Sequence, residues 1–177
     1  FCLPANIYKK KWFINNRVNI LTVGKFESRK NHLLLIKALS RLKIRRNFKL
    51  TIVGECTSEK HFSYLTKVKK AAKKSQLNIE TLTNISPNSV KELYKKHDFF
   101  VLASVNEPAS ISNLEAMANG LPVITTDTNK TSCYTKDGIN GFIVKSNSIR
   151  NLSNKIKFFI NNKSELKKFG SKSLSIV

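Results

Sequence analysis

Two glutamates eight residues apart are the residues of this chain best suited to chemistry. Glu107 stands before Pro108 in a loop of small residues, and Glu115 lies about one turn inside the predicted helix that follows. A carboxylate accepts hydrogen bonds from vicinal hydroxyls, as the acidic residue of dinucleotide-binding sites does with ribose. The pair suits a ligand with sugar hydroxyls, and the backbone N–H groups of Ser110 and Ile111 at the helix start could hold a diphosphate. Taken singly, either glutamate is also compatible with an exposed helix or turn residue.

A second polar loop precedes another predicted helix. It runs from Gly24 to Asn31, where Gly24 permits a tight turn and Lys25 and Lys30 supply two cations near the helix N-terminus. A phosphate or diphosphate would be well held there. The alternative is a solvated basic loop, because lysines are common throughout the chain. No GxGxxG or GxxxxGK[ST] pattern occurs, so neither a dinucleotide fingerprint nor a P-loop is indicated.

The elements that must position these loops alternate along the chain. Short apolar runs predict strands at 19–23, 50–53, 79–82, 99–102, 123–126 and 142–144. Helical spacing of apolar residues falls between and after them, at 31–42, 62–72, 87–97, 111–118, 148–159 and 165–177. Ser86 is the expected N-cap of the third helix, before Pro87. This alternation predicts an α/β fold with a doubly wound, Rossmann-like parallel sheet, which binds ligands beyond the carboxyl ends of its strands.

Length and cysteine content narrow the class of protein. A chain of 177 residues suits one domain, which we expect over 19–177, with residues 1–18 as a linker from a missing N-terminal domain and both ends cut. The three cysteines are odd in number and widely spaced, which fits a reducing cytoplasm and argues against a structural zinc site. Cys133 is expected to be a small buried residue. The histidines are expected to be packing or surface residues.

The net charge of +21 comes from 32 Lys and Arg against 11 Asp and Glu. Such a charge attracts phosphates, nucleic acid or an anionic membrane surface. The basic residues are nevertheless spread along the whole chain, are mostly Lys, and accompany many Asn and Ile, a mixture that codon bias in an AT-rich genome also produces. The charge is therefore compatible with an anionic partner and also with codon bias alone.

The stretch from Leu114 to Ile124 reads LEAMANGLPVI. Together with Glu107 it resembles the EX7E motif of the family-four (group 1) glycosyltransferases, whose usual form is Glu-Gly-Phe-Gly-Leu followed by Leu-Glu-Ala-Met-Ala-x-Gly-x-Pro-Val. The loop at Gly24 resembles the Gly-Arg-x-x-x-x-Lys element of the same family, and the resemblance spans roughly residues 20–144. The segments EPASISNLEAMANG and TDTNKTSCYTKDGINGF are similar to the branch found in capsule, lipopolysaccharide and exopolysaccharide gene clusters.

The resemblance implies the C-terminal, donor-binding half of a GT-B enzyme and assigns roles by position. Lys25 and Lys30 would bind the donor diphosphate beside Ser110, Ile111 and Ser112, Glu107 would contact the transferred sugar, and Glu115 would hold the ribose. Thr83, Asn84 and Ile85 would lie beside the base. Two departures stand out. Lys25 replaces the usual Arg and lacks its planar fork, and Pro108-Ala109-Ser110 replaces Gly-Phe-Gly, which leaves the identity of the sugar open.

The function implied is transfer of a sugar, with retention and without a metal or cofactor, from a nucleotide-diphosphate sugar that we expect to be UDP-linked. The acceptor would be a glycan or lipid-linked acceptor of surface polysaccharide biosynthesis, and the protein would be cytoplasmic or peripheral on the inner face of the membrane. The fragment alone should bind nucleotide without turnover. One alternative is a basic nucleic-acid-binding domain, although no helix-turn-helix, zinc-finger or RNP-like signature is present. The other is an inactive GT-B scaffold subunit, against which the retained Glu107, Glu115 and Lys30 argue.

Overall fold

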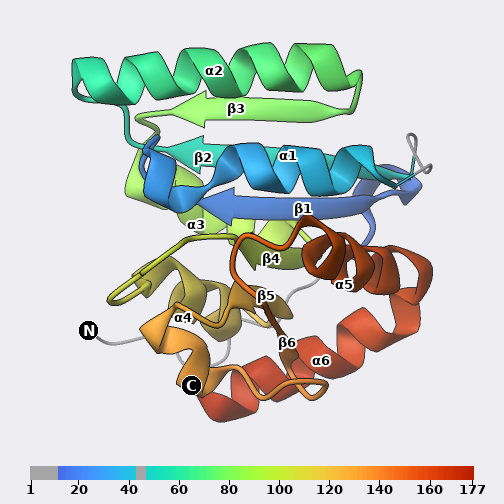
Figure 1. The fold of residues 1–177 in the computed structure, drawn as a ribbon. Coiled ribbons are helices and arrows are strands. Elements are labelled where there is room, and N and C mark those ends of the chain that lie inside the picture. Colours follow the sequence, from blue (N-terminus) through green and yellow to red (C-terminus); the bar gives the residue numbers. More distant parts are fainter. Residues whose placement is uncertain (1–11, 43–46) are drawn as a thin grey trace.

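A parallel sheet forms the centre of the molecule (Figure 1). The computed structural model describes residues 12–42 and 47–177. Within these ranges the sheet has six strands in the order β3-β2-β1-β4-β5-β6, namely β1 (Val18–Val23), β2 (Phe48–Gly54), β3 (Ile79–Thr83), β4 (Phe99–Leu102), β5 (Val123–Thr126) and β6 (Gly141–Val144). Every pair of neighbours is parallel. The predicted doubly wound sheet is confirmed, with strand ends moved by at most two residues.

Helices cover both faces of this sheet (Figure 1). They are α1 (His32–Ser40), α2 (Glu59–Ser75), α3 (Pro87–Lys96), α4 (Ile111–Ala118), α5 (Ile149–Asn161) and α6 (Lys163–Ile176). Helices α1, α2 and α5 pack on one face, α3 and α4 pack on the other, and α6 contacts both α4 and α5. Short 3-10 turns lie at η1 (Ile14–Asn16), η2 (Ser28–Lys30) and η3 (Lys130–Tyr134).

The inner strands β1, β2, β4 and β5 are buried and largely apolar because both faces of the sheet are covered. In β1, Ile20 packs toward α1 and α5, whereas its neighbour Leu21 packs toward α3 and α4. Both side chains are fully buried. Burying a side chain of this size stabilises the fold by about 1.5–3 kcal/mol relative to exposure, so this alternation fixes which side of β1 faces which layer of helices.

Two helix starts follow from short polar side chains. The predicted N-cap is confirmed, because Ser86 Oγ accepts a hydrogen bond from Ser89 N ahead of Pro87. The second helix begins at Glu59, three residues before the predicted start, because Ser58 caps it by accepting from His61 N. A capping hydroxyl satisfies one of the free N–H groups of the first turn, and a pattern of apolar residues alone does not mark that position.

A buried carboxylate joins the amino-terminal ends of the neighbouring strands β1 and β4. Asp98 accepts hydrogen bonds from the backbone N–H of Asn19 at 2.6 Å and of Phe13 at 2.9 Å. Trp12 and Phe13, which belong to the expected linker, pack against the core, while residues 1–11 of that linker lie outside the described residues. These contacts hold the start of β1 beside β4.

Helix α6 touches the end of α4 through two glycines. Gly120 has a positive φ of 68°, and a Cβ on Gly170 would collide with the carbonyl oxygen of Gly120. This close approach fixes the position of α4, which carries Glu115. Among the described residues, no helix combines the length and the apolar character needed to cross a membrane.

Candidate functional site

The strand order places a switch point between β1 and β4. From β1 the chain proceeds to β2 on one side, and from β4 it proceeds to β5 on the other. The connections after β1 and β4 therefore run to opposite sides of the sheet and leave a crevice between them. Ligands of open α/β sheets bind at such a crevice. The two loops meet here, because Val105 N donates to the carbonyl oxygen of Arg29 at 2.9 Å.

Glu107 is the buried carboxylate of this junction, with 3% of its side chain exposed. Its Oε2 lies 2.5 Å from Nζ of Lys30, and its Oε1 lies 2.9 Å from Nη1 of Arg29. The backbone is fixed from the loop after β5, because Glu107 N donates to Thr128 O and Lys130 N donates to Glu107 O. Two cations and two backbone hydrogen bonds therefore hold one carboxylate in a single orientation.

These contacts decide the charge of the carboxylate. Burial by itself raises the pKa of Glu107, but the hydrogen bonds and positive charges of Lys30 and Arg29 outweigh burial and lower the pKa below its ordinary value. The same hydrogen bond to Glu107 raises the pKa of Arg29. At neutral pH the site therefore contains a fully ionised glutamate with two cations beside it.

Gly24 makes room for the side chain of Lys30. A Cβ at Gly24 would lie 3.0 Å from Cδ of Lys30 and 3.1 Å from Cε, tighter than ordinary packing. Its φ is not positive, in contrast to Gly120 and Gly138, so the bend at Gly24 does not depend on a left-handed backbone. The glycine instead allows the lysine stem to pass over the end of β1 toward Glu107.

Glu115 is held by a tyrosine from the neighbouring helix. The hydroxyl of Tyr94 on α3 donates to Oε2 of Glu115 at 3.0 Å. Burial, and then the negative charge of Glu115, raise the pKa of Tyr94 well above its ordinary value, so the phenol stays a donor. Tyr94 is 1% exposed and Glu115 is half-buried. One oxygen of the carboxylate is thus fixed by the protein.

The serines at the start of α4 are used by the fold. Ser110 is buried and caps the helix by accepting from Asn113 N at 3.3 Å. Ser112 Oγ donates to the carbonyl oxygen of Val23 at 3.2 Å, which joins α4 to the end of β1. Ile111 between them is 51% exposed. The hydroxyls are therefore occupied, and what this turn offers a ligand is the helix N-terminus itself.

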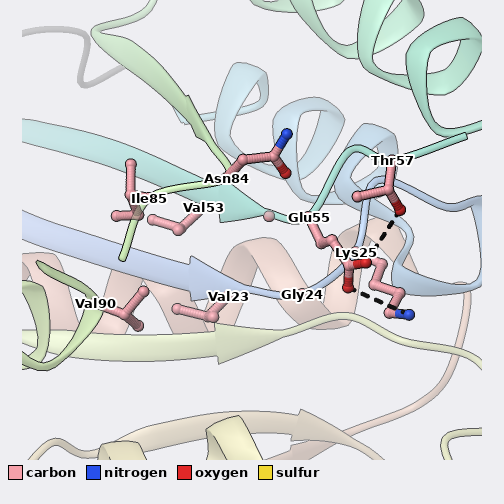
Figure 2. Close-up of a pocket in the computed structure, with 10 residues that line it drawn as sticks. Val23, Gly24, Lys25, Val53, Glu55, Thr57, Asn84, Ile85 and Val90 are labelled. Carbon is pink, nitrogen blue, oxygen red and sulfur yellow. Dashed lines mark hydrogen bonds and ion pairs between the residues drawn. The ribbon is translucent and has the colours of Figure 1, made fainter. Parts of the chain in front are cut away.

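A groove of about 630 Å³ lies beside the end of β1 (Figure 2). One end is apolar, with Val23, Val53, Ile85 and Val90, and the other is polar. At the polar end Lys25 Nζ lies 3.3 Å from Glu55 Oε2, and Thr57 Oγ1 donates to Glu55 Oε1 at 3.0 Å. The remaining wall residues are Gly24, Gly54 and Asn84. The groove could receive a flat apolar group at one end and a charged group at the other.

The sequence model of the family described as glycosyl transferases group 1 matches residues 5–174 of this chain. The chain belongs to this family. The domain is a GT-B glycosyltransferase domain, as the predicted resemblance implied. Among curated relatives, a Campylobacter jejuni N-acetylgalactosamine-N,N'-diacetylbacillosaminyl-diphospho-undecaprenol 4-alpha-N-acetylgalactosaminyltransferase is 36% identical over 111 residues, which are 61% of this chain and 27% of that enzyme. The matched segments span between 17% and 35% of the curated relatives' own lengths.

Solved structures share the fold of this group 1 domain. The C-terminal domain of the group 1 protein LpcC from Francisella tularensis superposes with a TM-score of 0.84 at 22% identity, over 98% of this chain and 92% of that one. Anabaena HepE in complex with UDP and glucose gives a TM-score of 0.82 at 18% identity, over 92% of this chain and 44% of that one. The fold comparison therefore extends over nearly the whole chain.

The structure brings some predicted site residues of this glycosyltransferase domain together and separates others. Lys30 contacts Glu107, whereas Lys25 faces the groove and pairs with Glu55. Asn84 and Ile85 line the groove, and Thr83 is exposed at the end of β3. The amide of Asn84 is occupied by the backbone of Cys56, donating to its O at 3.0 Å and accepting from its N at 2.8 Å. Cys133, expected to be buried, is exposed on η3.

Three residues of the site were missed by sequence reasoning. Arg29 neighbours Lys30 in sequence, but its contact with Glu107 depends on the approach of two distant loops. Tyr94 lies within the predicted helix 87–97, and a buried tyrosine hydroxyl usually has a partner, which here is Glu115. Glu55 follows β2 directly, a position at the carboxyl edge of the sheet that could have indicated it. No group of three or more His, Cys, Asp or Glu side chains within the described ranges could hold a metal ion.

Proposed function

We propose that this domain binds the donor of a retaining, metal-independent glycosyltransferase that transfers a sugar from a nucleoside diphosphate sugar. The observation that carries the proposal is the ion pair between Lys30 and the buried Glu107 at the switch point of the sheet. A cation suited to a diphosphate and a carboxylate suited to sugar hydroxyls stand next to each other there. The groove beside them is large enough for further parts of a nucleotide sugar.

Each part of the donor has a matching group in the site. Lys30 and Lys25, together with the N–H groups at the start of α4, suit the diphosphate. Glu115, with one oxygen fixed by Tyr94, suits the ribose hydroxyls. The apolar end of the groove, which includes Ile85, suits the base. Cations and N–H groups that stabilise charge on the leaving diphosphate supply electrostatic catalysis, so no covalent nucleophile is required in this proposal.

We further propose a UDP-linked donor and a glycan or lipid-linked acceptor in surface polysaccharide biosynthesis. HepE is described with UDP and glucose, and the Campylobacter relative acts, by its name, on a diphospho-undecaprenol compound. Because the relatives are several times longer than the matched segment, a second domain would supply the contacts to the acceptor. The domain alone would then bind nucleotide without turnover.

We also propose that the intact enzyme works on the cytoplasmic face of an anionic membrane. Helix α2 supports this, because its six lysines are all exposed and Phe62 on the same helix is 56% exposed. The only acidic residue of this helix is Glu59. Basic residues near an anionic leaflet contribute about 1 kcal/mol each. The competing assignment of the charge, to nucleic acid, has no recognition motif in the sequence to support it.

Calorimetry of the chain with UDP, GDP and ADP in EDTA tests the donor site. We expect UDP to bind at millimolar concentration or better, since half a cleft binds weakly, and the presence of EDTA shows that no divalent metal is needed. No binding of any of the three nucleotides at millimolar concentration would overturn the donor-site assignment. An inactive scaffold that had lost the site would give the same negative result, whereas tight binding of a short oligonucleotide without nucleotide binding would favour the nucleic-acid alternative.

A further inference from the structure

Arg29 lies between two carboxylates at the centre of the site. Its Nη1 is 2.9 Å from Oε1 of Glu107 and its Nη2 is 2.7 Å from Oε1 of Glu27. Its carbonyl oxygen accepts from Val105 N, so its backbone also joins the loop after β4. No part of the donor is assigned to this residue in the proposed function.

The two oxygens of Glu107 have different partners. Lys30 occupies Oε2 and Arg29 occupies Oε1. A donor diphosphate and Glu107 would compete for the single ammonium group of Lys30, and the diphosphate carries the larger charge. Once Lys30 turns to the diphosphate, Arg29 is the remaining cation on a carboxylate that is 3% exposed. A buried carboxylate without a partner is strongly disfavoured and takes up a proton instead.

We propose that Arg29 is a positioning residue, which keeps Glu107 charged and oriented while Lys30 moves from Glu107 to the donor diphosphate. This inference rests on the proposed function and extends it to a partner exchange. The exchange frees Oε2 of Glu107, which then accepts a hydrogen bond from a hydroxyl of the transferred sugar. Arg29 thereby influences recognition of the sugar and leaves recognition of the nucleoside diphosphate to other residues.

The geometry explains why an arginine serves here. A guanidinium presents several donors in a rigid plane, so it can bridge Glu27 and Glu107 at once, whereas a lysine offers one point charge. Glu27 holds the far side of the guanidinium, and the side chain of Arg29 is 38% exposed. Arg29 can therefore keep its contacts with Glu27 and Glu107 when a donor enters. Lysine at position 29 should keep the positive charge beside Glu107 but orient the carboxylate of Glu107 less well.

The first test compares the affinities of the chain for UDP, UDP-glucose, UDP-galactose and UDP-N-acetylgalactosamine in the wild type, Arg29→Gln, Arg29→Lys and the surface control Arg150→Gln. In Arg29→Gln we expect UDP affinity to change less than about twofold and the preference for the best UDP-sugar over UDP to fall about tenfold, the scale of a charge-assisted hydrogen bond. Arg29→Lys should recover part of that preference. An unchanged preference in a folded Arg29→Gln protein would overturn the proposal.

A second measurement does not depend on any nucleotide. Carbon-13 NMR of glutamate carboxyls, with Glu107→Gln to assign the signal, gives the pKa of Glu107 in each variant. We expect it to rise in Arg29→Gln and to be nearly restored in Arg29→Lys, while Arg150→Gln leaves it unchanged. If the wild type binds none of the nucleotides, the proposed function fails and the titration still decides whether Arg29 holds Glu107. A pKa unchanged by Arg29→Gln would sink that role.

Discussion

The phenol of Tyr94 on α3 donates a hydrogen bond to Oε2 of Glu115 on α4 over 3.0 Å. The two side chains come from consecutive helices on the same face of the sheet, and the tyrosine is almost fully buried. Because burial and the neighbouring carboxylate both keep the phenol protonated, the donor is present at all physiological pH values. One oxygen of Glu115 is therefore oriented before any ligand arrives, which is what a site for two adjacent hydroxyls requires.

Glu115→Ala should weaken nucleotide binding. If the carboxylate accepts hydrogen bonds from ribose hydroxyls, its loss should cost about 1.5–3 kcal/mol for uridine and for UDP alike. Glu92→Ala is the matched control, because Glu92 is an exposed glutamate on α3 that pairs with nearby Lys95. Calorimetric titration checks both variants. A basic nucleic-acid surface predicts instead that Glu115→Ala leaves oligonucleotide binding unchanged or slightly improved.

Tyr94→Phe separates orientation of Glu115 from its charge. The variant keeps the ring packed against Phe100 and removes only the hydroxyl. We expect the free energy of unfolding to fall by about 1 kcal/mol, the usual net contribution of a hydrogen bond, and UDP affinity to fall less than in Glu115→Ala. Urea denaturation and calorimetry measure the two effects. A UDP affinity equal to that of the wild type would show that Tyr94 has no part in the site.

The sequence predicted the elements well because each one is marked locally. The strand at 99–102 and the helix at 111–118 were predicted at their observed residues, since a continuous apolar run marks the strand, and Pro108 and Gly120 flank the helix. Helix α2 was predicted too short, because its first turn is polar and is set by the cap at Ser58. Local signals therefore sufficed for the fold and for the cap at Ser86, and failed at the polar first turn of α2, which apolar spacing does not mark.

The site was predictable only as far as its motif residues. The approach of Lys30 to Glu107 follows from the strand order, which places β1 beside β4. The contact of Arg29 with the same carboxylate depends on the conformation of two loops, and nothing in their sequence indicates it. Asn84 was predicted to lie beside the base, and it does line the groove, but its amide is hydrogen-bonded to the backbone of Cys56. Side-chain partners of this kind depend on tertiary distances that periodicity does not contain.

Lys30→Ala and Lys25→Ala should differ in their effect on the diphosphate. Lys30 is 11% exposed and directed at the junction, whereas Lys25 is 53% exposed and paired with Glu55 across the end of the groove. A cation shielded from water interacts more strongly with phosphate than an exposed one. We expect Lys30→Ala to weaken UDP much more than uridine, and Lys25→Ala to have a smaller effect of the same kind. Parallel titrations with UDP and uridine give the comparison, and equal effects on both ligands would contradict the assignment of Lys30.

His32→Phe should make stability less sensitive to acid. The imidazole is buried between Phe26 and Tyr64, and neither ring nitrogen has a hydrogen-bond partner in the described part of the chain. Burial, and then the charge of Lys30, lower the pKa of His32 from 6.5 to about 3. Between these pH values the unfolded chain binds a proton that the folded chain does not, so the free energy of unfolding falls as the pH is lowered.

Phenylalanine has no such proton to bind, and it preserves the ring contacts. The variant should therefore be at least as stable as the wild type at pH 7, and its advantage should grow as the pH falls from 6.5 toward 3. Urea denaturation of both proteins at pH 7, 5.5 and 4.5 measures the difference, in which the titration of the carboxylates largely cancels. A difference that stays constant with pH would show that His32 does not stay neutral in the folded protein.

Charge reversal on α2 should abolish binding to anionic vesicles. The variant Lys67→Glu, Lys70→Glu, Lys74→Glu changes three exposed lysines of this helix, and the control Lys157→Glu, Lys167→Glu, Lys172→Glu makes the same change in net charge on exposed positions of α5 and α6. Removing three contacts of about 1 kcal/mol each should weaken co-sedimentation with phosphatidylglycerol vesicles roughly a hundredfold or more.

The control variant should weaken co-sedimentation far less, and raising the salt concentration should reduce binding of the wild type because exposed charges are screened. Equal losses of binding in the two variants would mean that net charge alone drives the association. Wild-type binding that is absent at low salt, or indifferent to salt, would rule out α2 as a surface for an anionic membrane.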